Sequence, residues 1–175
     1  MSYVVLGYPK ISQGDFDWIQ SIQQKYDLMQ FTVVKPHVTY VFPTHRLDED
    51  ALIKHVESKV IDTSAFKIKL DSTKVVENDS KNYFHAFLMP SVGFEEITKL
   101  HDVLYTDSLK SELRLDIPFI PHLGIGNNPS EEIMNELVNT INEDGVSIVG
   151  EIDTLTVSRY DGSKVIDIKQ VPLVS

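Results

Sequence analysis

Two histidines, each directly after a proline, are the residues in this sequence whose types and spacing suggest that they act together in catalysis. His37 lies in the segment PHVT at residues 36–39, and His122 lies in the similar segment PHLG at residues 121–124, about half of the chain away. A neutral imidazole can remove a proton from an attacking oxygen while a protonated imidazole gives a proton to a leaving oxygen. The pair therefore indicates acid–base catalysis, and phosphoryl chemistry in particular, at neutral pH.

A hydroxyl group accompanies the first histidine. Side chains two residues apart in a strand point to the same side, so His37 and Thr39 share a face if residues 31–43 form a strand, as their β-branched and aromatic composition predicts. Hydroxyl and imidazolium donors can hold the non-bridging oxygens of a phosphate. In the second segment Gly124 takes the place of this threonine, which removes one hydroxyl but permits close approach of backbone N–H groups.

The two segments belong to a longer internal repeat. Residues 31–43 and 116–128 align without a gap on their Pro-His pairs, and an acid-led helix is predicted a few residues after each. Two copies of a strand–helix unit, each with one histidine, predict two lobes that face each other across a cleft and bring both imidazoles to one substrate. Repetition is also a simple way to build a core, so the repeat alone does not establish function.

The elements that must position these residues follow from hydrophobic periodicity and capping signals. We predict helices at residues 15–28, 48–60, 94–104 and 130–144, and strands at residues 3–8, 31–43, 66–76, 83–89, around 122, 148–160 and 164–171. A turn is expected at residues 78–82. Hairpins together with strand–helix alternation predict an α+β fold with mainly antiparallel sheet, in one domain that covers residues 1–175.

Composition limits the classes of partner. The net charge of −10 and the pI near 4.9 disfavour binding to long duplex nucleic acid, which needs a broad basic surface. The absence of cysteine excludes disulfides and thiolate catalysis, and the six histidines show no metal-binding spacing. No apolar run is long enough to span a membrane, and the N-terminus lacks the pattern of a signal peptide. We expect a cytoplasmic monomer without a metal or cofactor.

The segments HVTY and HLGI resemble the paired H-x-[ST]-hydrophobic motifs of the two-histidine (2H) phosphoesterase superfamily, which includes 2′-5′ RNA ligase-like proteins and 2′,3′-cyclic phosphodiesterases. The resemblance covers most of the chain, including the closing pattern at residues 155–162 and 172–173. It implies a bilobal fold of two pseudo-symmetric lobes with flanking helices and a central groove. It also implies metal-independent hydrolysis of a 2′,3′-cyclic phosphate, or of a related cyclic or 2′-5′ phosphodiester, on a small nucleotide or RNA end.

Carried over residue by residue, the resemblance makes His37 and His122 the acid–base pair and Thr39 a phosphate donor. Gly124 departs from the motif, since the family has a second threonine or serine at this place. Losing a neutral hydrogen bond to phosphate costs on the order of 1–3 kcal/mol, so a site with both histidines could remain active. The same departure also fits a catalytically weakened nucleotide-binding or regulatory module on the same fold, and both hypotheses stay open.

Other side chains are further candidates for the site. Tyr40 could stack on a base, although an aromatic residue in a strand is more often buried in the core. Arg159 could contact phosphate, although an arginine at the end of a strand is more often simply exposed to solvent. His85 could line the groove or pack within the sheet. We expect the remaining histidines at the surface: His45, His55 and His101.

Overall fold

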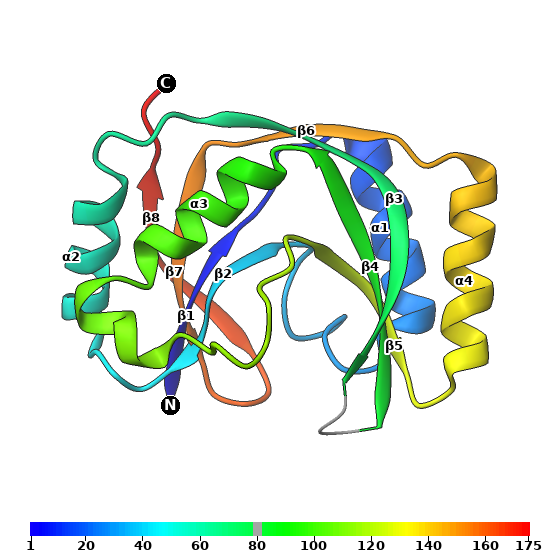
Figure 1. Ribbon diagram of the computed structural model, residues 1–175, viewed down its shortest axis with the longest axis horizontal. Coiled ribbons are helices and arrows are strands. Elements are labelled where there is room, and N and C mark those ends of the chain that lie inside the picture. The colour runs from blue at the N-terminus through cyan, green and yellow to red at the C-terminus, as the bar shows by residue number, and fades with distance from the viewer. Residues whose placement is uncertain (79–81) are drawn as a thin grey trace.

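The chain contains both single strands that alternate with helices and runs of consecutive strands (Figure 1). The computed structural model describes residues 1–78 and 82–175, so most of the turn expected at residues 78–82 lies outside the described residues. The elements are β1 (Ser2–Gly7), α1 (Gln13–Tyr26), β2 (Val38–Thr44), α2 (Glu49–Val60), β3 (Phe66–Asn78), β4 (Tyr83–Val92), α3 (Phe94–Leu104), the 3-10 helix η1 (Asp107–Glu112), β5 (Leu123–Asn128), α4 (Glu131–Asp144), β6 (Ile148–Ile152), β7 (Thr154–Tyr160) and β8 (Val165–Pro172). No helix in the described part of the chain is long and apolar enough to cross a membrane.

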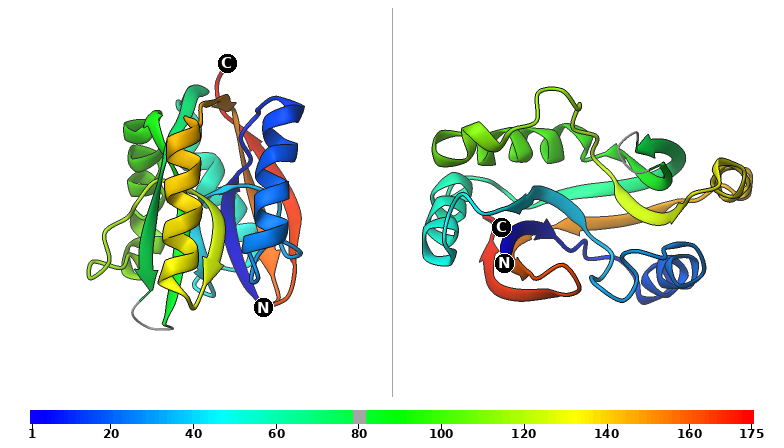
Figure 2. Two further views of the ribbon diagram at one scale, coloured as in Figure 1. Left: turned by 90° about the vertical axis from the view of Figure 1, so that its right-hand side faces the viewer. Right: turned by 90° about the horizontal axis from the view of Figure 1, so that it is seen from below.

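Within the described residues, two antiparallel four-stranded sheets form the framework. Sheet A has the strand order β2-β1-β7-β8, and sheet B has the order β5-β4-β3-β6. Helices α2 and α3 pack on sheet A, whereas α1 and α4 pack on sheet B. The two helix pairs therefore lie at opposite ends of the molecule (Figure 2). This architecture confirms the predicted α+β class with antiparallel sheets and flanking helices.

Polar residues cap α2 and α4 at the predicted positions. The Asp48 carboxylate accepts a hydrogen bond from the N–H of Ala51 at the start of α2. The Ser130 hydroxyl accepts one from the N–H of Ile133 at the start of α4. Such contacts satisfy amide groups that have no partner inside the helix. Gly145 ends α4 with a φ of 77°, a left-handed conformation that glycine adopts without steric cost.

Two strand predictions need correction. The strand expected at residues 31–43 begins only at Val38. In the segment before it, Asp27 and Gln30 accept hydrogen bonds from the backbone N–H groups of residues that follow them, and these bonds bend the chain into turns. The strand expected at residues 148–160 is divided at Asp153. Its first part, β6, pairs with β3 in sheet B, and its second part, β7, pairs with β1 and β8 in sheet A. This segment therefore passes from one sheet to the other.

Two helical histidines are buried, so their predicted surface location is wrong. His55 is 9% exposed, and its Nε2 lies 2.8 Å from the carbonyl oxygen of Leu104, the last residue of α3. His101 is 3% exposed, and its ring lies parallel to that of Phe119 with the ring centroids 3.7 Å apart. Its Nδ1 contacts the carboxylate of Asp102. Each ring therefore has a polar partner, which offsets the cost of burying its nitrogen atoms.

Candidate active site

Each of the two motif histidines lies one residue before an edge strand. His37 precedes β2, at one edge of sheet A, and His122 precedes β5, at one edge of sheet B. These two strands contact each other. The fold thus brings together the two segments that are related by the internal repeat.

The same backbone contact orients both rings. Nδ1 of His37 is 2.8 Å from the carbonyl oxygen of Lys35, and Nδ1 of His122 is 2.6 Å from that of Ile120. A carbonyl oxygen only accepts, so in each neutral ring Nδ1 carries the proton and Nε2 keeps its lone pair. The residues that the structure describes give neither Nε2 a hydrogen bond. Each Nε2 is therefore available to exchange a proton with a bound molecule.

The proline before each histidine explains this shared geometry. Proline fixes its own φ and restricts the residue before it to extended conformations. The carbonyl group of that preceding residue, Lys35 or Ile120, is thereby held in the same position relative to the imidazole two residues later. Sequence reasoning missed the role of these two carbonyls, although the repeated Pro-His pair was the signal that could have revealed it.

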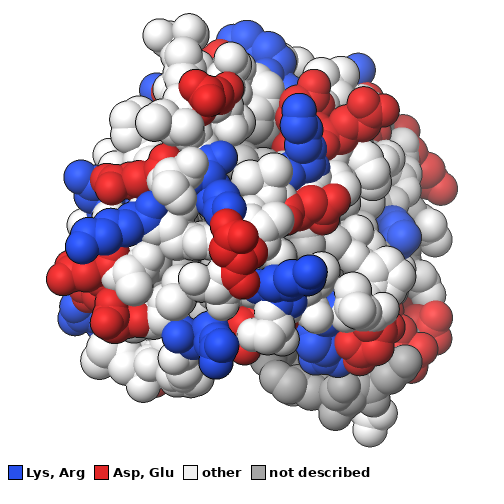
Figure 3. All heavy atoms as spheres, turned by 60° about the vertical axis from the view of Figure 1, so that its left-hand side comes forward, with Lys and Arg blue, Asp and Glu red and all other residues white. Residues whose placement is uncertain are grey.

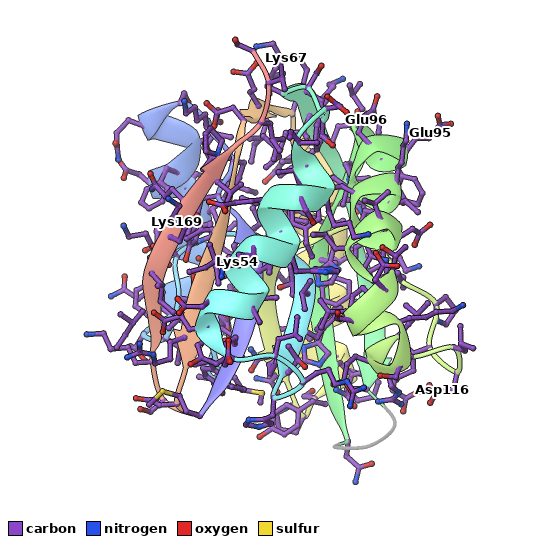
Figure 4. The ribbon with its side chains drawn as sticks, turned by 90° about the vertical axis from the view of Figure 1, so that its left-hand side faces the viewer. Lys54, Lys67, Glu95, Glu96, Asp116 and Lys169 are labelled. Carbon is purple, nitrogen blue, oxygen red and sulfur yellow. The ribbon has the colours of Figure 1, made fainter. Side chains whose placement is uncertain are left out.

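Strand register places the predicted hydroxyl beside the first imidazole. Leu6 on β1 pairs with Thr39 on one side and with Thr156 on the other, and directly opposed side chains in antiparallel strands point to the same side. We call the face that carries these three residues the inner face of sheet A; α2 covers the other face (Figure 4). By alternation along the chain, His37 also points to the inner face. Thr39 is half-buried there.

Three aromatic rings are stacked on sheet B. The ring of His122 lies against that of Phe87, with the centroids 3.6 Å apart and the planes 17° from parallel. Phe87 also lies parallel to His85, with the centroids 5.9 Å apart. We call these three residues the aromatic column. It places His85 on the face of sheet B that carries His122.

Both motif imidazoles favour the neutral form in the free protein. Burial lowers the pKa of His37, and it lowers the pKa of His122 to about 4. The backbone carbonyl contacts act in the opposite direction on both pKa values, and the charge of Asp27 also raises the pKa of His37. Positive charge on His37 or His85 lowers the pKa of His122 further, so the three rings lie close enough to interact. A histidine that donates a proton must therefore gain it when a negatively charged ligand raises its pKa.

The lowered pKa of His122 predicts that acid destabilises the folded protein through this residue. Its pKa is about 4 in the folded protein against an ordinary value of 6.5, so between these values the unfolded chain binds the proton and the folded chain does not. The free energy of unfolding should decrease as the pH falls through this range, by up to about 3 kcal/mol from this group. Urea unfolding at neutral and acidic pH should show a smaller loss for His122→Asn than for the wild type. Equal losses of unfolding free energy in the two proteins would show that protonation of His122 does not cause the acid destabilisation.

Gly124 is surrounded by open space. A Cβ atom placed on this residue would have no heavy atom of the described residues within 4 Å, its two chain neighbours aside. Its carbonyl oxygen accepts a hydrogen bond of 2.8 Å from Nε2 of Gln23 and so ties α1 to β5. Across the sheet Gly124 pairs in register with Phe87, whose ring leans toward His122. The space of the missing hydroxyl is therefore left open by the neighbouring side chains.

The structure contradicts two of the predicted binding residues. Tyr40 is 0% exposed; it lies one residue after Thr39, so strand alternation turns its ring into the core. Arg159 lies three residues after Thr156 on β7 and therefore on the opposite face, where its Nη2 is 2.6 Å from the carboxylate of Glu49 on α2. Base stacking by Tyr40 and phosphate contact by Arg159 are therefore wrong predictions.

A buried carboxylate supports the loop that leads to His37. Asp27 is 6% exposed, and its Oδ1 accepts a hydrogen bond of 2.8 Å from the backbone N–H of Gln30. The same oxygen accepts a hydrogen bond from Nδ2 of Asn127 on β5. Asp27 therefore links the loop before His37 to the strand that follows His122. Nothing in the sequence distinguishes this residue from the other acidic residues at helix ends.

The face of the molecule that Figure 3 presents shows no concentration of one charge. Figure 3 shows basic and acidic side chains interspersed on the face that it presents. Among the described residues, no group of three or more histidine, aspartate or glutamate side chains could hold a metal ion. A hollow of about 510 Å³ lies along α3 between Phe94 and Thr106 and is lined by neither motif histidine. The paired imidazoles are therefore the feature around which the candidate site is built.

Comparison with known proteins agrees with this geometry. The family model of the 2′-5′ RNA ligase superfamily matches residues 10–164. Solved structures with the same fold include E. coli LigT with 3′-AMP (TM-score 0.63, 14% identity, 100% of both chains) and a protein of Thermus thermophilus (TM-score 0.65, 13% identity, 99% of this chain and 98% of the other). Kluyveromyces marxianus Usb1 also matches (TM-score 0.56, 9% identity, 98% of both chains). Comparison with curated protein sequences gave no significant match. Because the family match extends over most of its length, the chain belongs to the 2′-5′ RNA ligase superfamily of 2H phosphoesterases.

Proposed function

We propose that this protein is a metal-independent phosphoesterase that hydrolyses a 2′,3′-cyclic phosphate, or a related cyclic or 2′-5′ phosphodiester, on a nucleotide or an RNA end. The observation that carries this proposal is the pair of imidazoles just before two contacting edge strands, each anchored through Nδ1 with its Nε2 available. Structures of E. coli LigT with 3′-AMP and with ATP support a nucleotide as the ligand.

The proposed reaction needs one proton acceptor and one proton donor. Nε2 of one histidine removes a proton from water as the water oxygen bonds to phosphorus. The protonated Nε2 of the other histidine gives its proton to the ribose oxygen as the P–O bond breaks. From a 2′,3′-cyclic nucleotide the product is a nucleoside 2′- or 3′-monophosphate, with the other of these two ribose hydroxyls released. The hydroxyl of Thr39 donates to a non-bridging phosphate oxygen, where negative charge develops.

The test is incubation of the purified protein with 2′,3′-cyclic nucleotides in the presence of a metal chelator, followed by phosphorus NMR. We expect a nucleoside 2′- or 3′-monophosphate to accumulate at a rate that the chelator does not change. The double variant His37→Ala/His122→Ala should form product at least about a hundredfold more slowly, because both proton-transfer groups are gone. Equal activity in that variant would overturn the proposal.

Gly124 supports a second hypothesis, a weakened nucleotide-binding or regulatory module on the same fold. The second motif lacks its hydroxyl, and no side chain among the described residues fills the space. This hypothesis expects calorimetry to detect binding of a nucleoside monophosphate while no cyclic nucleotide is hydrolysed over a long incubation. Turnover by the wild-type protein would contradict it.

A further inference from the structure

A smaller cavity lies beside the loop that leads to His37. It has a volume of about 230 Å³, and its walls include Tyr8, Gln20, Phe31, Lys35, Val165 and Asp167. The loop between α1 and β2 (Figure 1) forms one wall, and a backbone hydrogen bond of 3.1 Å from Val165 to Val33 holds it against the start of β8. Pockets for whole drug-sized ligands begin at about 300 Å³. The cavity therefore suits one ring system rather than a whole nucleotide.

The cavity shares a wall with the candidate active site. Lys35 lines the cavity, and its carbonyl oxygen accepts the hydrogen bond from Nδ1 of His37. Tyr8 follows Gly7, which pairs with Val38, so alternation puts Tyr8 and His37 on the inner face of sheet A together. A nucleotide whose phosphate is held at His37 therefore has the cavity next to it.

A carboxylate held by two hydroxyl groups is one of the polar groups that line the cavity. Oδ1 of Asp167 accepts hydrogen bonds from the hydroxyl groups of Tyr8 at 2.9 Å and of Ser158 at 2.8 Å. No residue in the described part of the chain donates to Oδ2 of Asp167. Burial and the charge of Asp167 both raise the pKa of Tyr8, so this hydroxyl stays protonated and keeps donating. The two hydroxyls hold the carboxylate in place and leave one oxygen for a ligand.

A chain of amide groups provides a second acceptor. The carbonyl oxygen of Gly124 can only accept, so the group that contacts it at 2.8 Å is the NH₂ of Gln23. The amide oxygen of Gln23 then accepts a hydrogen bond of 2.7 Å from the NH₂ of Gln20. Gln20 lines the cavity, and this orientation leaves its amide oxygen as the group that can accept from a ligand.

From these contacts we infer that the cavity binds the base of the nucleotide and prefers guanine. The inference rests on the proposed function and names the substrate class of the same site. Guanine presents two adjacent N–H donors on its pairing edge, which match the acceptors of Asp167 and Gln20. Uracil flanks its one N–H with two carbonyl oxygens, and adenine and cytosine place a ring-nitrogen acceptor beside the amino group. Each of these three bases would place a hydrogen-bond acceptor next to the carboxylate oxygen, where no hydrogen bond can form. The ring of Phe31 offers a surface for stacking.

Calorimetric binding of 3′-GMP and 3′-UMP tests the inference without requiring turnover. We expect 3′-GMP to bind at least about tenfold more tightly. Asp167→Asn should reduce this ratio to about threefold or less, because an amide N–H then faces the guanine donors while the amide oxygen still accepts from Tyr8 and Ser158. Asp144→Asn is the matched control: it removes one exposed charge at the end of α4 and should leave the ratio unchanged.

Turnover of 2′,3′-cyclic GMP and 2′,3′-cyclic UMP separates this inference from the proposed function. Equal kcat/KM for both substrates, with equal binding of the two monophosphates, would overturn the guanine subsite and leave the hydrolase intact. Selective binding of 3′-GMP without hydrolysis of either substrate would retain the subsite and remove the proposed function. A guanine preference that survives Asp167→Asn would overturn the inference, as would failure of both monophosphates to bind.

Discussion

Replacement of either motif histidine by alanine is expected to lower kcat for hydrolysis of a 2′,3′-cyclic nucleotide by about two to four orders of magnitude. Each substitution removes the Nε2 that would move a proton. His37 and His122 precede β2 and β5 rather than lie within them, so the strands should still form. KM should change less than kcat, because Thr39 and backbone groups remain to hold the phosphate. Initial rates over a range of substrate concentrations measure both constants.

The control for this experiment is His45→Ala, since His45 is exposed in the loop after β2. It should retain wild-type kcat and KM. The double variant at His37 and His122 should lose about as much activity as each single variant, because proton acceptor and donor act in one step. Urea unfolding checks that all variants fold. A folded variant of either histidine that keeps the wild-type kcat would remove that residue from the proposed reaction.

The α+β architecture was predictable because most elements carry their own local signal. Ser130 and Gly145 flank α4 as predicted, since a cap and a left-handed glycine are properties of the residues themselves. The division of residues 148–160 at Asp153 was not predictable in this way. Both parts have strand composition, and only their pairing with different sheets separates them. Burial of His55 likewise depends on a distant group, the carbonyl of Leu104 at the end of another helix.

For the candidate site, the sequence predicted which residues of one strand share a face, but not which residues of different strands lie close together. The i, i+2 rule placed His37 and Thr39 on one face, and the same rule puts Tyr40 on the other, so that error was avoidable. The face of Arg159 depends on the register of β7 against β1, which no local pattern records. The contact of His122 with Phe87 depends in the same way on the pairing of β5 with β4. Site residues that lie on one strand can thus be predicted from the sequence. Contacts that depend on how two strands pair cannot.

Restoring a hydroxyl at position 124 is expected to increase the rate. Gly124→Thr should raise kcat/KM for a 2′,3′-cyclic nucleotide by about ten- to a hundredfold, the value of one hydrogen bond of about 1–3 kcal/mol to the reacting phosphate. The fold has room for the change, because a Cβ at this position meets no heavy atom within 4 Å in the part of the chain that the structure describes. The backbone is also not in the left-handed region, so a β-branched residue suits this strand. Steady-state kinetics of the variant and the wild type make the comparison.

Gly124→Val separates the hydroxyl from the bulk of the side chain. Valine has the branched shape of threonine but cannot donate a hydrogen bond, so it should give no increase in kcat/KM. Equal increases in both variants would assign the effect to packing against Phe87, the residue paired with Gly124. An active wild type with no gain from threonine would mean that a backbone N–H already serves as the second phosphate donor. An inactive wild type that threonine activates would instead identify the chain as a weakened enzyme, with its histidines in place and one donor missing.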